Sequence, residues 1–190
     1  MRVVKPSRCC ASIVERMTAE RGNTLVIGLG NPILGDDGIG WHVAEAVEAA
    51  SLEPAGKSST SFEYCSAGGL GLMELMVGYE KVIIADAIAR EGGKIGTVLS
   101  MPFTALTPAH ANSSHDATLY SALETGRKMG WPLPSEIWVV GVEIEPSYTF
   151  SETLSPAVAA AIPQAAELVL ARLESALAKN PGVALPSKAR

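Results

Sequence analysis

Residues 24–40, TLVIGLGNPILGDDGIG, contain the pattern of a strand, a glycine-rich turn and the start of a helix. The apolar run Leu25–Ile27 predicts a buried strand, and the glycines after it predict a sharp turn. Two carboxylates, Asp36 and Asp37, follow where apolar residues begin to recur at helical spacing. A strand that passes through such a turn into a helix is the first half of a βαβ unit. Open α/β sheets bind ligands outside the carboxyl ends of their strands, so this turn is expected to border the site.

The glycines Gly28 and Gly30 match the start of the dinucleotide fingerprint G-x-G-x-x-G, but the rest of the turn does not. The third glycine would fall at position 33, which is Ile33. Asp36 and Asp37 would also repel a pyrophosphate from the helix N-terminus, whose free amides otherwise bind it. The turn therefore favours a cation over a nucleotide.

The composition describes a folded chain without a basic surface. Hydrophobic residues make up 47% of the 190 residues and charged residues 18%, which is typical of a domain with a real core. The formal net charge of −5 gives no footprint for nucleic acid or anionic lipid, and no apolar run approaches the ~20 residues that span a bilayer. The three cysteines form no C-x-x-C pair, and no export signal is recognisable, which indicates a reducing cytoplasm.

The chain is expected to hold one domain with an extension at each end. We predict an N-terminal extension over residues 1–23, a single α/β domain over residues 24–180 and a C-terminal tail over residues 181–190. No internal repeat interrupts the central range.

Four further runs predict the rest of the sheet. The unbroken apolar residues of Lys81–Ala87 and Ile137–Val142 are typical of parallel strands covered on both faces. Ser61–Cys65 alternates polar and apolar residues, as an edge strand with one wet face does. Ile95–Ser100 follows too closely for a parallel crossover, so it is expected at the edge or antiparallel. The predicted fold class is α/β, a three-layer α/β/α sandwich around a mostly parallel five-stranded sheet.

The second half of the chain alternates long loops with helices. Pro102–Ser114 and Glu143–Ser155 have no usable period, and loops this long in a compact domain are usually functional. A helix is predicted from His115 to Lys128. Another is predicted from Ser155-Pro156 to Lys179, with a break near Pro163.

Three side chains of metal-ligand type converge in this topology. Asp37 follows the first strand, Asp86 ends the strand Lys81–Ala87, and His115 opens the helix that leads to the last strand. All three are expected at the carboxyl edge of the sheet. Two carboxylates and one imidazole, with waters completing the shell, suit a divalent first-row metal. The dipole at a helix N-terminus disfavours a charged imidazole, which suits a neutral ligand.

Each of these residues also has a structural interpretation. Asp36 or Asp37 can cap the first helix, and we assign the cap to Asp36. Loop amides can satisfy a carboxylate such as Asp86, and a single histidine is often structural. Because Asp37, Asp86 and His115 converge at one sheet edge, a shared site explains them better than three separate structural roles. His42 and His110 are predicted not to be ligands.

The ordered motifs LVIGLGNPILGDDGIG, GGLGLMELM, VIIADA, SSH and GVEIEPSYTFSETLSPAV resemble those of the hydrogenase maturation endopeptidases, over residues 24–178. The resemblance implies a protease that removes a short C-terminal peptide from a nickel-iron hydrogenase large-subunit precursor, its partner, after nickel insertion. It further implies that Asp37, Asp86 and His115 bind the nickel supplied by the precursor and are the catalytic residues.

The same resemblance assigns substrate binding to Asn31, Gly68 and Gly69. The turn before these glycines carries Ser66-Ala67, where the family commonly has an acidic residue. Two questions stay open at this point. The first is whether the reaction uses a metal-bound water or chemistry of the aspartic type. The second is whether the protein is instead a non-catalytic nickel-sensing chaperone or an unrelated small metallohydrolase.

Overall fold

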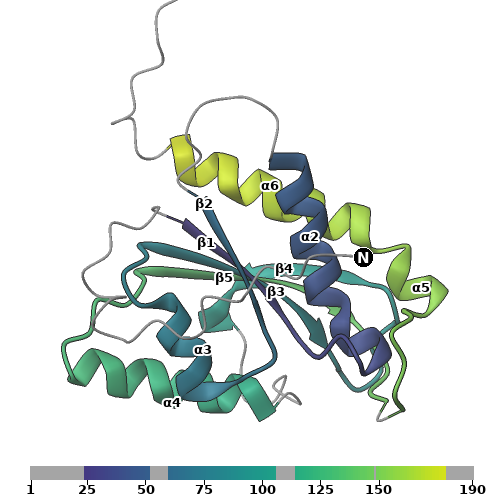
Figure 1. The fold of residues 1–190 in the computed structure, drawn as a ribbon, viewed down its shortest axis with the longest axis horizontal. Coiled ribbons are helices and arrows are strands. Elements are labelled where there is room, and N and C mark those ends of the chain that lie inside the picture. The colour runs from purple at the N-terminus through teal and green to yellow at the C-terminus, as the bar shows by residue number, and fades with distance from the viewer. Residues whose placement is uncertain (1–23, 52–59, 106–113, 148, 179–190) are drawn as a thin grey trace, which may run out of the picture.

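The computed structural model describes residues 24–51, 60–105, 114–147 and 149–178, with the side chains of residues 114–118 and 176–178 outside that description. Its centre is one five-stranded sheet in the order β2-β1-β3-β5-β4 (Figure 1). The strands are β1 (Thr24–Leu29), β2 (Thr60–Cys65), β3 (Lys81–Ile88), β4 (Val98–Pro102) and β5 (Glu136–Glu143). β1 pairs in parallel with β2 and β3, β3 pairs in parallel with β5, and β4 pairs antiparallel with β5. The predicted mostly parallel sheet is confirmed.

Helices cover both faces of this sheet. They are η2 (Gly35–Gly38), α2 (Ile39–Ser51), α3 (Gly69–Met76), η3 (Phe103–Ala105), α4 (Ser114–Lys128), α5 (Pro156–Ala159) and α6 (Ile162–Ala178). One buried cluster joins α3 and α4 to the sheet, and a second joins α2 and α6 to the opposite face. Figure 1 shows the two helix pairs on either side of the strands. The three-layer sandwich is therefore confirmed.

Both faces of β1 are apolar because helices cover the sheet on both sides. Leu25 and Ile27 belong to the cluster under α3 and α4, whereas Val26 between them belongs to the cluster under α2 and α6. Successive side chains of a strand point to opposite faces, so both faces of a covered strand must be apolar. All three residues have no exposed surface.

Several predicted boundaries shift by a few residues. The strand expected at Ile95–Ser100 is β4, Val98–Pro102, and it is the antiparallel edge strand that the short connection required. The last helix is broken between α5 and α6, and Pro163 is the second residue of α6. Proline tolerates the first turn of a helix because its missing N–H has no partner there, so the predicted break precedes it.

The edge strand β2 differs from the prediction of one dry and one wet face. Residues Thr60–Tyr64 are all half-buried, and Cys65 is buried. The reason is that β2 lies at the edge of a sheet with helices on both sides, so each of its faces is partly covered.

Two predictions lie outside the described residues. The N-terminal extension 1–23 and the tail 181–190 are not part of the structure described. Within the described part, the helical stretch Pro156–Ser175 is long and apolar enough to cross a membrane by length and composition. Its Val158, Ala165 and Val169 are buried in the core beneath α2, so it packs as a core element.

Candidate active site at the carboxyl edge of the sheet

Two of the predicted site residues lie at the ends of neighbouring strands. β1 and β3 are hydrogen-bonded partners with Gly28 opposite Ala85, and Asp86 is the next residue of β3. Asp37 lies in η2, the short turn after β1, and this turn contacts β3. The fold therefore brings Asp37 and Asp86 to one edge, where open α/β sheets bind ligands.

The carboxylate of Asp37 is held from within its own turn. Its Oδ2 accepts a hydrogen bond from the backbone N–H of Asn31, 2.7 Å away. The side-chain oxygen of Asn31 in turn accepts from the backbone N–H of Ile33 at 3.2 Å. A hydrogen bond to a charged acceptor is about twice as strong as a neutral one. Asn31 thus orients Asp37, and its predicted contact with substrate stays a prediction.

The turn after β1 requires a glycine at position 30. Its φ of +123° is one that other residues rarely adopt, and a Cβ there would overlap the backbone oxygen of Asp37. Its N–H donates to Cys65 O at 3.0 Å, and Ser66 Oγ donates back to Gly30 O at 3.0 Å. The turn is therefore tied to the end of β2, beside the predicted substrate-binding pair Gly68 and Gly69.

Gly40 lets the first helix approach the strand ends. A Cβ on Gly40 would overlap the carbonyl oxygens of Leu29, the last residue of β1, and of Ala85 in β3. Without a side chain there, α2 begins directly against β1 and β3. This close approach is what places η2, and with it Asp37, beside the end of β3.

Asp86 is a buried carboxylate. Its exposed fraction is 8%, and its Oδ1 accepts a hydrogen bond from the backbone N–H of Ala87 at 2.8 Å. A charge is costly to bury without such partners, so a carboxylate at this place has to be compensated locally. Asp86 is therefore not an ordinary surface charge.

His115 lies in the first turn of α4, and its side chain is outside the described part of the chain. The far end of α4 leads through residues 129–135 to the start of β5, so its first turn points toward the carboxyl edge (Figure 1). Among the side chains described, no three of His, Cys, Asp and Glu type lie close enough together to hold a metal. His115 as third ligand remains a prediction.

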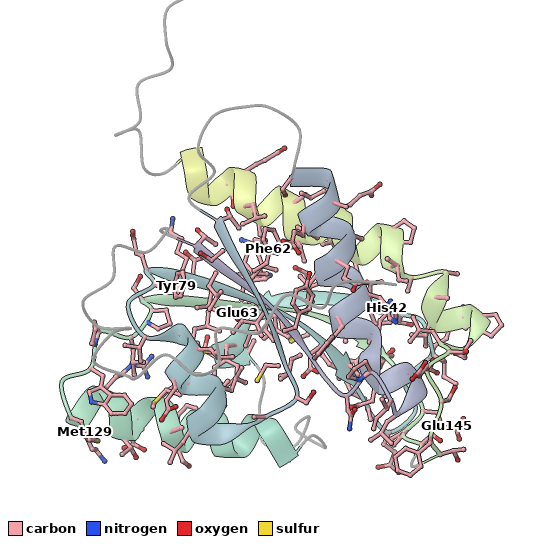
Figure 2. The ribbon with its side chains drawn as sticks, viewed as in Figure 1. His42, Phe62, Glu63, Tyr79, Met129 and Glu145 are labelled. Atoms are coloured by element: carbon pink, nitrogen blue, oxygen red, sulfur yellow. The ribbon has the colours of Figure 1, made fainter. Side chains whose placement is uncertain are left out.

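The other two histidines were predicted not to be ligands. His42 (Figure 2) is partly exposed on α2, with its Nδ1 3.9 Å from Glu45 Oε2. His110 lies outside the described residues.

The assignment of Asp36 as the cap of the first helix is wrong. Its Oδ1 accepts a hydrogen bond from the backbone N–H of Ser155 at 2.6 Å, and η2 has no side-chain cap. The extra turn of η2 before α2 directs this carboxylate toward the loop that follows β5. Asp36 therefore joins two segments that lie 119 residues apart in the sequence.

Glu143 is a buried carboxylate that the sequence analysis missed. It is 3% exposed at the end of β5, and its Oε1 lies 2.7 Å from Arg90 Nε. The hydrogen bond from Arg90 is the main reason that the pKa of Glu143 lies below its ordinary value. Lys94 also donates its backbone N–H to Oε2 at 3.2 Å. The sequence did contain a signal for Glu143. Like Asp86, it is a carboxylate that follows an unbroken apolar run.

A shallow pocket lies at the opposite edge of the sheet. It is lined by residues at the starts of β1, β3 and β5 and by the C-terminal half of α6: Thr24, Lys81, Glu136, Trp138, Arg172 and Ser175 among them. The guanidinium of Arg172 stacks on Trp138, 3.2 Å from the ring centroid. By its place in the fold this pocket is remote from Asp37 and Asp86.

Comparisons with known proteins agree on one family. The family model described as hydrogenase maturation protease matches residues 64–172. The hydrogenase 2 maturation protease of Escherichia coli (strain K12) is 33% identical over 154 residues, 78% of this chain and 89% of that protein. The solved hydrogenase maturating endopeptidase HybD from E. coli aligns with a TM-score of 0.67 at 29% identity, covering 81% of this chain and 93% of that one. A hydrogenase 2 maturation peptidase from a Thaumarchaeota archaeon aligns with a TM-score of 0.54 at 29% identity, covering 81% and 98%.

Proposed function

The chain belongs to the hydrogenase maturation protease family, and from this premise we propose that it removes the C-terminal extension of a nickel-iron hydrogenase large-subunit precursor after nickel insertion. The proposal is carried by the position of two carboxylates at the carboxyl edge of the sheet: Asp37 in η2, which contacts β3, and Asp86 near the end of β3, which pairs with β1. Family membership indicates that the reaction is proteolysis, and the two carboxylates indicate where in the fold it would take place.

In this proposal the nickel ion is cargo of the substrate. Asp37, Asp86 and His115 would contact the ion while the precursor still holds it, which would bring the adjacent peptide bond to the sheet edge. Carboxylate and imidazole ligands suit such an ion. Backbone amides already hold one oxygen of Asp37 and one of Asp86, at 2.7 and 2.8 Å. Both side chains are thus oriented before the substrate arrives.

The peptide bond would be hydrolysed with a carboxylate as general base. The carboxylate takes a proton from water, the water oxygen attacks the scissile carbonyl carbon, and the C–N bond breaks as the amine takes up a proton. Contact between the carbonyl oxygen and the ion would stabilise the developing negative charge. Asp37 suits the role of base because it is only half-buried and open to water, whereas Asp86 is buried. Chemistry of the aspartic type would instead use both carboxylates without a metal.

The decisive experiment is a processing assay with nickel-loaded and nickel-free precursor. Release of the C-terminal peptide from the loaded form alone is expected. Equal release from both forms would overturn nickel recognition and favour chemistry of the aspartic type. Binding of the loaded precursor without any cleavage would show a nickel-sensing chaperone and overturn the protease assignment.

A carboxylate far from the site provides the matched control. Glu174 is exposed on the last turns of α6, near the residues that line the remote pocket. Glu174→Ala removes one negative charge, as Asp37→Ala does, but leaves the sheet edge unchanged. Its processing rate is expected to equal that of the wild type.

A further inference from the structure

Two exposed apolar side chains lie on loops that are paired through their backbones. Ile33 is 46% exposed in the turn after β1, and Phe150 is 78% exposed in the loop after β5. The residues that follow them, Leu34 and Ser151, form an isolated parallel bridge. Ser151 donates its N–H to Ile33 O at 3.0 Å and accepts from Gly35 N at 2.6 Å.

The bridge brings the backbones at Ile33 and Phe150 close together. Each of the two residues directly precedes a member of the bridged pair, so their exposed side chains extend from adjoining segments of the two loops. A single exposed apolar residue needs no explanation, but two on joined loops form a candidate binding surface. We call Ile33 and Phe150 together the apolar patch.

The apolar patch belongs to the same unit as the candidate active site. Ile33 donates its N–H to the side chain of Asn31, whose own N–H holds Asp37. On the other loop, the N–H of Ser155 is bound by Asp36, the residue next to Asp37. Whatever binds the patch is therefore held beside the Asp37 carboxylate.

The two loops of the patch are acidic. Residues 30–40 and 143–155 contain five carboxylates and no Lys or Arg: Asp36, Asp37, Glu143, Glu145 and Glu152. Glu143 is buried and paired with Arg90, so it adds little to the surface charge. Glu145 and Glu152 are exposed. A partner that fits this surface presents apolar side chains flanked by basic ones, because complementary charge steers association and fixes register.

We propose that the apolar patch is the surface on which the hydrogenase large-subunit precursor docks, through an apolar segment flanked by basic side chains. The inference rests on the proposed function and adds to it the place and chemistry of substrate recognition. The patch contacts parts of the substrate that do not react. Its loss therefore weakens the ground state and the transition state equally, which raises KM and leaves kcat unchanged.

The test compares Phe150→Ser and Ile33→Ser with Met129→Ser. Met129 is 62% exposed, between the values of Ile33 and Phe150, and lies at the opposite end of the molecule from Glu145 (Figure 2). Each patch variant is expected to raise KM about 10-fold, and the double variant about 100-fold, since a well-packed anchor contributes on the order of 1–2 kcal/mol. Met129→Ser is expected to keep the KM of the wild type. All three substituted positions are exposed, so thermal melts of the variants should match that of the wild type.

Direct binding of the precursor, measured by calorimetry, separates this inference from the proposed function. A patch variant with the KM and Kd of the wild type would overturn the docking surface and leave the protease assignment intact. A wild-type protein that binds precursor but does not cut it would overturn the protease, while the Kd of Phe150→Ser still decides the surface. Absence of both binding and cleavage would overturn both proposals. Weaker binding at higher salt is expected from the acidic surroundings.

Discussion

The backbone N–H of Asn31 donates a hydrogen bond to Oδ2 of Asp37 across the glycine turn, over 2.7 Å. This contact orients the carboxylate without any substrate, because a backbone amide in a rigid turn cannot rotate away. Gly30, with its φ of +123°, makes the turn possible. A carboxylate held in this way has less to lose in conformational entropy when it binds a ligand or takes a proton.

The first prediction concerns Asp37, Asp86 and His115. Replacing each with alanine is expected to lower precursor processing about 100-fold or more, the range expected for a lost acid–base group. The variants should remain folded, as circular dichroism and thermal melts will show. Asp86→Asn is a less disruptive variant at the same position, because it keeps the side-chain volume and one acceptor oxygen in a buried place. Full processing by any one of the alanine variants would remove that residue from the site.

A second prediction follows from the corrected role of Asp36. Asp36→Ala removes the charged acceptor of the Ser155 N–H, and the free energy of unfolding is expected to fall by about 1–3 kcal/mol. Asp36→Asn retains an acceptor oxygen and should cost less. Denaturant titrations measure both changes. Loss of all processing in Asp36→Asn, with its stability intact, would show that this aspartate and not Asp37 acts in the reaction.

The ion pair between the buried Glu143 and the partly exposed Arg90 predicts a pH dependence of stability. The pKa of Glu143 is lowered in the folded protein, so its contribution is fully present above its ordinary pKa of 4.5 and is lost as the pH falls through the folded-state pKa. Glu143→Gln is expected to be about 1–3 kcal/mol less stable at pH 7. This difference should begin to narrow below about pH 4.5, where the carboxyl group of the unfolded chain becomes protonated, and should be lost once the pH falls below the lower pKa of the folded protein.

Glu124 provides the control for that measurement. It forms an ion pair with Lys128 at 2.9 Å, but both side chains are exposed on α4. Solvent screens such a pair, so Glu124→Gln should change stability little at any pH. A constant difference between wild type and Glu143→Gln from pH 7 to pH 3 would contradict the role of the Glu143 charge.

The fourth prediction tests the close approach of α2 to the strand ends. Gly40→Ala puts a Cβ into the carbonyl oxygens of Leu29 and Ala85, which are backbone atoms and cannot move aside cheaply. The variant is expected to lose about 2 kcal/mol or more of stability, or to fail to fold. Gly71→Ala is the matched control within α3, where the new Cβ would lie 3.3 Å from the Ala67 side chain. Alanine's higher helix propensity should offset that contact, so equal stability losses in the two variants would refute the argument.

The fifth prediction concerns metal affinity. If the precursor brings the nickel ion, the isolated protein should bind nickel weakly, because three protein ligands fill only about half of a six-coordinate shell. Calorimetry with nickel, with and without precursor, measures this directly. Nanomolar binding by the protein alone, together with equal cleavage of nickel-free precursor, would show a self-sufficient metalloprotease.

The sequence by itself determined the sheet, and it predicted the edge at which the candidate site lies. Unbroken apolar runs such as those of β3 and β5 can be satisfied only between two layers of helices, and a parallel sheet gathers its carboxyl ends at one edge. A carboxylate at the end of such a run, as Asp86 is, therefore has its place set by local pattern and topology. The glycines that follow the first strand likewise predicted the sharp turn at this edge.

Only the tertiary structure decided which partner each carboxylate binds. Asp36 and Asp37 are neighbours of the same chemistry, yet one binds Ser155, 119 residues away, and the other binds Asn31 within its own turn. Arg90 and Glu143 are likewise 53 residues apart. These partners meet because loops without any periodic pattern pack against one another, and a pattern that repeats along one segment carries no information about a contact between two.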